Sequence, residues 1–197
     1  MAENAESEIV NLYQPKKRFI IPIDNFHVPK KLFKLFKRNT YTFKINNNFE
    51  NVIYKCQLAN RKDNGTWINS IILDSYLNLH YEKMAHSIEC YDQNKLIGGL
   101  YGVHIGGCFF GESMFSELSN TSKFCLLYLI AILKKNLFSI LDSQFYNEHL
   151  IQFGAFEIKN KIYLEKLTAS IDNDRAFTFI ENFQEVLSLL QPSNHKS

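Results

Sequence analysis

The spacing of apolar and polar residues along the chain predicts an alternation of short helices and strands. Apolar residues three or four apart favour helices, and strict alternation favours strands. One predicted helix begins directly after Val28-Pro29. The other predicted helices cover 49–58, 70–82, 119–135, 148–153 and 176–190. The predicted strands cover 41–45, 86–91, 95–103, 106–111, 138–145 and 157–163. This mixture indicates an α/β or α+β fold with a mixed sheet.

Local turn and capping signals support several of these boundaries. Asp92-Gln93-Asn94 joins two predicted strands into a hairpin. Asn64-Gly65 marks a turn. Ser119, Asn120 and Thr121 are expected to cap the helix that follows them, which is apolar on nearly every side and therefore buried.

Composition limits the class of protein. The chain has 197 residues, of which 46% are hydrophobic and 21% charged, so it is long enough for one domain, or one domain with a small appendage. The four cysteines form no CxxC pair and lie at no zinc-ligand spacing with histidine, which favours buried free thiols. We find no signal peptide, and the longest apolar run, 124–133, is too short to cross a bilayer. We therefore expect a soluble, cytoplasmic protein without a membrane partner.

Charge is distributed unevenly. Residues 16–38 hold eight basic residues against Asp24 alone, a charge of +7, so the rest of the chain carries −5 within a total of +2. A basic block beside an acidic remainder favours a polyanionic partner, with RNA or DNA ahead of membrane.

Four blocks between Leu96 and Gln144 change the picture from a general class to a particular family. They are Gly98-Gly99-Leu100-Tyr101-Gly102-Val103, Phe109-Phe110-Gly111-Glu112-Ser113-Met114-Phe115-Ser116, Asn120-Thr121-Ser122-Lys123 and Leu141-Asp142-Ser143-Gln144. They resemble, in the same order, the GGLYG, FxGESMFS, NASK and DxQ blocks of the leucyl/phenylalanyl-tRNA–protein transferases. Ala85-His86-Ser87-Ile88-Glu89, Thr66-Trp67-Ile68, Phe26-His27-Val28 and Asn147-Glu148-His149-Leu150 extend the resemblance on both sides.

The resemblance implies an acyltransferase domain of the GNAT type preceded by a smaller N-terminal domain. We assign 1–40 to a remnant of that N-terminal subdomain with its basic helix, 41–190 to the acyltransferase domain and 191–197 to a disordered tail. The implied reaction moves Leu or Phe, and Met more weakly, from aminoacyl-tRNA to the α-amine of proteins that begin with Arg or Lys, which creates a degradation signal. The expected partners are the charged tRNA and the acceptor protein. We expect a monomer that needs no cofactor or metal.

By resemblance, the catalytic residues are Asp142, Gln144 and Glu112. Asp142 and Gln144 are two apart on a predicted strand, so their side chains should share a face and can orient the amine or the ester. Glu112 stands in an apolar run, where a carboxylate must be paired or face a cleft.

The remaining site residues are also assigned by resemblance. Leu100, Phe109, Met114 and Leu141 align with the apolar pocket that receives the amino acid. Trp67 is expected to stack on the terminal adenine, with Tyr13 as a substitute for a second stacking ring. The basic residues Lys30, Lys34, Lys37 and Arg38 are expected to contact tRNA phosphates.

The N-terminus departs from the family pattern. Family members have further sequence that ends in a Phe-Pro element, whereas Met1-Ala2-Glu3 resembles the residues just after it, and the aromatic motif is reduced to 12–16. We hypothesise that translation starts upstream or that the N-terminal domain is degraded. An intact mass starting at Met1, measured on protein from the native host, would rule out the upstream start.

Two other functions stay open. One is a different GNAT enzyme, either an acyl-CoA N-acetyltransferase or a peptidoglycan-type aminoacyltransferase, although 116–123 lacks the pyrophosphate-binding loop of a CoA enzyme. The other is an inactive RNA-binding module, which the retention of Glu112, Asp142 and Gln144 disfavours.

Overall fold

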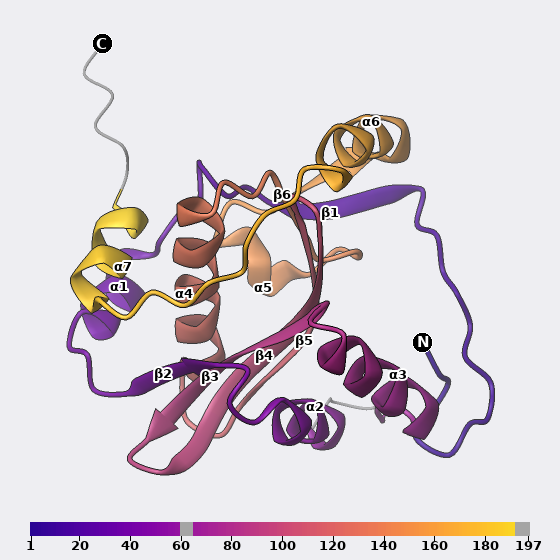
Figure 1. Ribbon diagram of the computed structural model, residues 1–197, viewed down its shortest axis with the longest axis horizontal. Coiled ribbons are helices and arrows are strands. Elements are labelled where there is room, and N and C mark those ends of the chain that lie inside the picture. Colours follow the sequence, from indigo (N-terminus) through magenta and orange to yellow (C-terminus); the bar gives the residue numbers. More distant parts are fainter. Residues whose placement is uncertain (60–64, 192–197) are drawn as a thin grey trace.

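A seven-stranded mixed sheet forms the centre of the computed structural model, which describes residues 1–59 and 65–191 (Figure 1). The strands are β1 (Lys17–Ile21), β2 (Thr42–Ile45), β3 (Ala85–Asp92), β4 (Lys95–Ile105), β5 (Cys108–Ser116), β6 (Ile140–Asp142) and β7 (Phe156–Lys159). The helices are α1 (Lys30–Phe36), α2 (Phe49–Leu58), α3 (Ser70–Tyr81), α4 (Thr121–Lys135), α5 (Glu148–Ile151), α6 (Asn160–Ile171) and α7 (Phe183–Leu190). The predicted α/β class with a mixed sheet is confirmed, and it is compatible with the acyltransferase domain that the resemblance implies.

The strand order is β2-β3-β4-β5-β6-β1-β7, and among the strands that the structure describes only β5 and β6 pair in parallel. The chain passes from β5 through α4 to β6, as a parallel pair requires a long connection. β1 returns from the N-terminal part of the chain and pairs between β6 and β7. The strand next to β6 is therefore supplied by residues distant in sequence.

Helices cover both faces of the sheet. On one face α4 packs with α1 and α7 over a core that includes Phe36, Ile130 and Val186, and we call this the α4 face. On the other face α2 and α3 cover β3 to β5, while α6 covers β5, β6 and β1. Phe110 packs in the α6 cluster and its cross-strand partner Val103 in the α2–α3 cluster, so these two clusters share a face.

The N-terminal elements β1 and α1 contribute to the same sheet and core as residues 41–190. Phe19 of β1 and Leu32 of α1 are buried in the α4-face core. The predicted division at residue 40 stays a prediction. Of the predicted tail, 192–197 lies outside the described residues, as does Asn64 of the predicted turn.

Most predicted helices and strands lie where local patterns placed them. The helices α1, α2 and α3 and the β3–β4 hairpin match the prediction within a few residues, and Gln93 in the hairpin turn has a positive φ of 53°. The strand predicted at 106–111 continues to Ser116. All four cysteines are buried thiols outside any disulfide, as expected.

Three predicted boundaries and one cap are wrong. The strand at 138–145 ends at Asp142, and the strand at 157–163 ends at Lys159, where helix α6 begins. The helix at 176–190 begins only at Phe183. Asn120 makes no side-chain capping bond to α4, because Ser116 Oγ accepts the Ser122 N–H at 3.0 Å instead.

No helix among residues 1–59 and 65–191 is long and apolar enough to span a membrane. The same residues contain no cluster of three or more His, Cys, Asp or Glu side chains arranged to hold a metal ion.

Candidate active site

The sheet opens between β5 and β6, and the predicted carboxylates lie at this opening. β6 accompanies β5 only from Cys108 to Phe110, while β5 continues to Ser116. Glu112 is an extra residue in the β4–β5 ladder, because Gly111 pairs with Gly102 and Ser113 pairs with Tyr101. This β-bulge bends the strand and directs the Glu112 side chain to the face covered by α3, where it bonds to Tyr76.

Asp142, the last residue of β6, is fully buried, and both of its carboxylate oxygens accept hydrogen bonds. Its Oδ2 accepts hydrogen bonds from Arg18 Nε at 3.1 Å, from Arg18 Nη2 and from the Tyr163 hydroxyl at 2.7 Å. Its Oδ1 accepts the backbone N–H of Gln144 at 2.8 Å. The Arg18 guanidinium also lies 4.7 Å from the centre of the Tyr163 ring. Residues from β1, β6 and α6 thus meet at one carboxylate.

Gln144 is not on a strand, which corrects the prediction that strand alternation places it beside Asp142. Its φ is +60°, in the left-handed region, so the chain turns directly after β6. Phe19 of β1 holds this turn, since its N–H donates to the Gln144 carbonyl at 3.1 Å and its carbonyl accepts the Ser143 N–H at 3.0 Å. The turn directs Gln144 Nε2 to Glu112 Oε1, at 3.5 Å.

Glu112 is half-buried and makes hydrogen bonds with neutral donors, the Gln144 amide and the Tyr76 hydroxyl of α3. Burial raises the pKa of Glu112 to about 7 and the nearby Asp142 charge adds to this, while the Tyr76 hydrogen bond and the Arg18 charge oppose it. Burial and the Glu112 charge raise the pKa of Tyr76, so its hydroxyl stays protonated and donates. Glu112 can therefore gain and lose a proton near neutral pH.

The four predicted pocket residues lie as two pairs on the α4 face. Leu100 is directly opposite Met114, and Phe109 is directly opposite Leu141. Leu100, Phe109 and Leu141 are buried in the core, whereas Met114 is 37% exposed and lines an open groove of about 700 Å³. Phe109 and Met114 are five residues apart, and in a regular strand an odd spacing would place them on opposite faces. The extra residue at the Glu112 bulge keeps both on one face.

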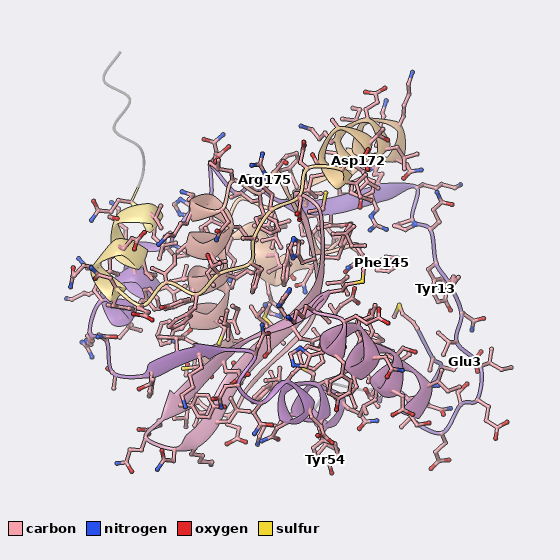
Figure 2. The ribbon with its side chains drawn as sticks, in the orientation of Figure 1. Glu3, Tyr13, Tyr54, Phe145, Asp172 and Arg175 are labelled. Carbon is pink, nitrogen blue, oxygen red and sulfur yellow. The ribbon has the colours of Figure 1, made fainter. Side chains whose placement is uncertain are left out.

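The predicted tRNA-contacting residues are not brought together. Trp67 is half-buried against the α2–α3 cluster, and its carbonyl accepts the Ala2 N–H at 3.0 Å. Tyr13 is 58% exposed and lies on the same side of the molecule as Phe145, the neighbour of Gln144 (Figure 2). Helix α1, with its exposed basic residues, lies at the opposite end from α3 (Figure 1). Those basic residues are Lys30, Lys34, Lys37 and Arg38.

Sequence reasoning did not select Arg18, Tyr163 or Tyr76 as site residues. The sequence places Arg18 in the basic block, and only the β1–β6 pairing, in which Ile20 lies directly opposite Asp142, brings Arg18 near that carboxylate. Tyr163 was placed in a strand, and only the helical spacing of Tyr163 and Leu167 indicates that it belongs to α6. No local pattern singled out Tyr76 within its predicted helix.

A sequence model of the leucyl/phenylalanyl-tRNA protein transferases matches residues 20–168. The chain belongs to this family. The leucyl/phenylalanyl-tRNA–protein transferase of Zymomonas mobilis is 42% identical over 173 residues, which cover 88% of this chain and 65% of that protein. The protein of the same name from Phenylobacterium zucineum is 41% identical over 171 residues, covering 87% of this chain and 77% of that protein.

The chain thus spans less than two thirds of the length of the Zymomonas mobilis relative. The family match begins after Arg18 but includes Tyr76, Glu112, Asp142 and Tyr163. The structure of L-PGS from Bacillus licheniformis is similar with a TM-score of 0.42 and 15% identity, covering 88% of this chain and 59% of that chain. A similarity at that level supports no conclusion about this family member.

Proposed function

We propose that this family member transfers Leu or Phe, and Met more weakly, from aminoacyl-tRNA to the α-amine of proteins that begin with Arg or Lys. The product carries a degradation signal, and the reaction takes place in the cytoplasm with the enzyme acting as a monomer. The family match over residues 20–168 carries this proposal. The cluster of Glu112, Asp142 and Gln144 at the sheet opening supports it.

The reaction needs positioning more than a covalent nucleophile. An α-amine has a pKa of about 7.7–8.0, so part of it is already neutral at neutral pH. The ester that joins the amino acid to tRNA is activated, and holding both reactants in place supplies roughly 7–11 kcal/mol of the barrier. A site built from two carboxylates and an amide suits this aminolysis.

We propose that Leu100, Phe109, Met114 and Leu141 receive the apolar side chain of the amino acid. The two pairs lie on the α4 face, on either side of Gly102 and Gly111, which pair with each other between them. Room beside the opening is left at Gly111, since a Cβ there would meet only the Asp142 carbonyl, at 3.7 Å, whereas the Phe109 ring fills the space over Gly102. Trp67 and Tyr13 would stack on the end of the tRNA.

The alternative is the activity of a different GNAT enzyme, either an acyl-CoA N-acetyltransferase or a peptidoglycan-type aminoacyltransferase. The sequence from Ser116 to Lys123 argues against the CoA-dependent enzyme. The segment lacks the Gly-rich loop that binds a pyrophosphate. The inactive RNA-binding alternative predicts tRNA binding without transfer, which an activity assay distinguishes.

The first test is transfer from labelled leucyl-tRNA to two peptides that differ only in the first residue, Arg or Gly. We expect label on the Arg peptide alone, and a loss of at least about 100-fold for Asp142→Ala, as for other groups that position a reacting amine. Glu157→Gln, which removes an exposed carboxylate paired with Lys17, serves as the control and should keep full activity. Absence of transfer from both leucyl- and phenylalanyl-tRNA would contradict the proposal.

A further inference from the structure

We propose that Glu112, and not Asp142, accepts the proton that the acceptor amine loses when it attacks the aminoacyl ester. Asp142 is then a positioning residue, which holds Gln144 and, through it, Glu112. This assignment rests on the proposed transferase function and divides the roles among the carboxylates of that site.

Asp142 is enclosed by protein donors and is not exposed to a substrate amine. A carboxylate offers about four lone-pair positions. Two N–H groups of Arg18 and the Tyr163 hydroxyl occupy Oδ2, and the Gln144 backbone N–H occupies Oδ1. Asp142 is also 0% exposed, and its charge is compensated by the Arg18 guanidinium. An amine could reach Asp142 only by displacing the buried groups around it.

Glu112 differs from Asp142 in each of these respects. Its hydrogen-bond donors, Tyr76 and Gln144, are neutral, and no described Lys, Arg or His lies within ion-pair distance of it. It is half-buried and stands at the bulge where β5 separates from β6. Its carboxylate therefore faces the opening with a charge that no neighbouring cation neutralises by contact.

The electrostatic surroundings agree with a proton acceptor. The charged or titratable groups that act on Glu112 are Tyr76 from α3, Asp142 from β6, Arg18 from β1 and the α-amine of Met1. With burial as the largest cause, they leave Glu112 with a pKa of about 7. A general base works best when its pKa lies near the operating pH, because it is then ionised and still basic.

The proton has a defined route in this step. The neutral amine nitrogen forms a bond to the ester carbonyl carbon and gives one proton to the Glu112 carboxylate. The bond between that carbon and the ribose oxygen then breaks, and the ribose oxygen leaves as a hydroxyl with the proton that Glu112 has held. The carboxylate is regenerated, and the products are an amide and free tRNA.

The test compares single-turnover transfer rates of the unaltered chain, Glu112→Gln and Glu157→Gln between pH 5.5 and 8.5, with labelled leucyl-tRNA and saturating Arg peptide. Ionisation of the peptide amine affects every variant equally, so it cancels in the ratio of rates. We expect the unaltered chain to exceed Glu112→Gln by about 100-fold or more at pH 8. The ratio should fall towards one below pH 6, where Glu112 is protonated, and Glu157→Gln should match the unaltered chain.

A second variant separates a proton acceptor from a structural carboxylate. Tyr76→Phe removes a hydrogen bond that lowers the pKa of Glu112. The ratio of the Tyr76→Phe rate to the Glu112→Gln rate should therefore have its midpoint at a higher pH than the ratio for the unaltered chain. A ratio that does not change with pH, a Glu112→Gln rate within a few-fold of the unaltered chain, or an unmoved midpoint in Tyr76→Phe would overturn the assignment. No transfer by the unaltered chain would instead overturn the proposed function on which it rests.

Discussion

Glu112 is held in an environment that disfavours its charged form, and this has a cost in stability. Its pKa rises from the usual 4.5 to about 7 in the folded chain, mainly through burial. As pH rises from 4.5 to 7, the unfolded chain loses this proton while the folded chain keeps it, so the free energy of unfolding falls. Above pH 7 the decrease is complete.

Glu112→Gln, which cannot ionise, should therefore be more stable than the unaltered chain at pH 8. We expect a gain of about 1–3 kcal/mol in the free energy of unfolding, vanishing near pH 4. Urea denaturation at the two pH values measures it, with Glu157→Gln as a control that stays within about 0.5 kcal/mol. An equal stability of both chains at pH 8 would mean that Glu112 is not disfavoured as an anion.

At the scale of elements, Arg18 links β1 to its neighbours, because its guanidinium pairs with Asp142 of β6 and lies over the Tyr163 ring of α6. Arg18→Gln leaves the Asp142 carboxylate buried without its cation, and we expect a loss of about 3–5 kcal/mol in the free energy of unfolding. The adjacent Lys17 makes an exposed ion pair with Glu157, so Lys17→Gln should cost at most about 1 kcal/mol. Thermal and urea unfolding compare the two, and equal losses would contradict a structural role for Arg18.

Local patterns were enough to predict the elements whose apolar spacing is set by their own sequence, such as α2 and the β3–β4 hairpin. They failed where tertiary contacts decide. The segment before α7 is extended because Phe177 stacks on His86 and Phe109 instead of continuing the helix. Gln144 leaves the strand period because Asp142 and β1 hold its backbone in a turn.

The candidate site was predicted in part. Resemblance selected Glu112, Asp142 and Gln144, which the structure brings within hydrogen-bond contact of one another through Gln144. It did not select Arg18, because Arg18 and Asp142 are 124 positions apart and no local pattern reports such a contact.

At the scale of the whole molecule, the basic helix α1 lies at the opposite end from α3 (Figure 1), and the candidate stacking residue Trp67 packs against the α2–α3 cluster. A bound tRNA that reaches both would extend across the protein. Replacing Lys30, Lys34 and Lys37 with Ala should weaken tRNA binding and make its affinity less dependent on salt. The slope of log affinity against log salt should become shallower by about 0.7–0.9 for each phosphate that the variant no longer neutralises. Filter binding across salt concentrations measures it.

The matched control replaces Lys44, Lys83 and Lys95, three exposed lysines outside α1, and should leave the slope unchanged. If the α1 variant keeps the slope of the unaltered chain, α1 does not contact phosphates. Its transfer rate at saturating tRNA should be normal in either case, because none of the residues that bond to Glu112 or Asp142 belongs to α1.

The bulge at Glu112 makes one position of β5 suitable for a clean deletion. Without residue 112, Gly111 and Ser113 would become consecutive and keep their present partners, Gly102 and Tyr101. Every other side chain of the strand would then stay on its present face, and only the carboxylate would be removed. Removing Ser113 would also close the bulge, but Glu112 would remain, opposite Tyr101. Removing any one residue from 114 to 116 would instead turn side chains before it to the opposite face or force the bulge to move. A library of single-residue deletions along β5 should therefore contain one folded, inactive member, the one that lacks Glu112.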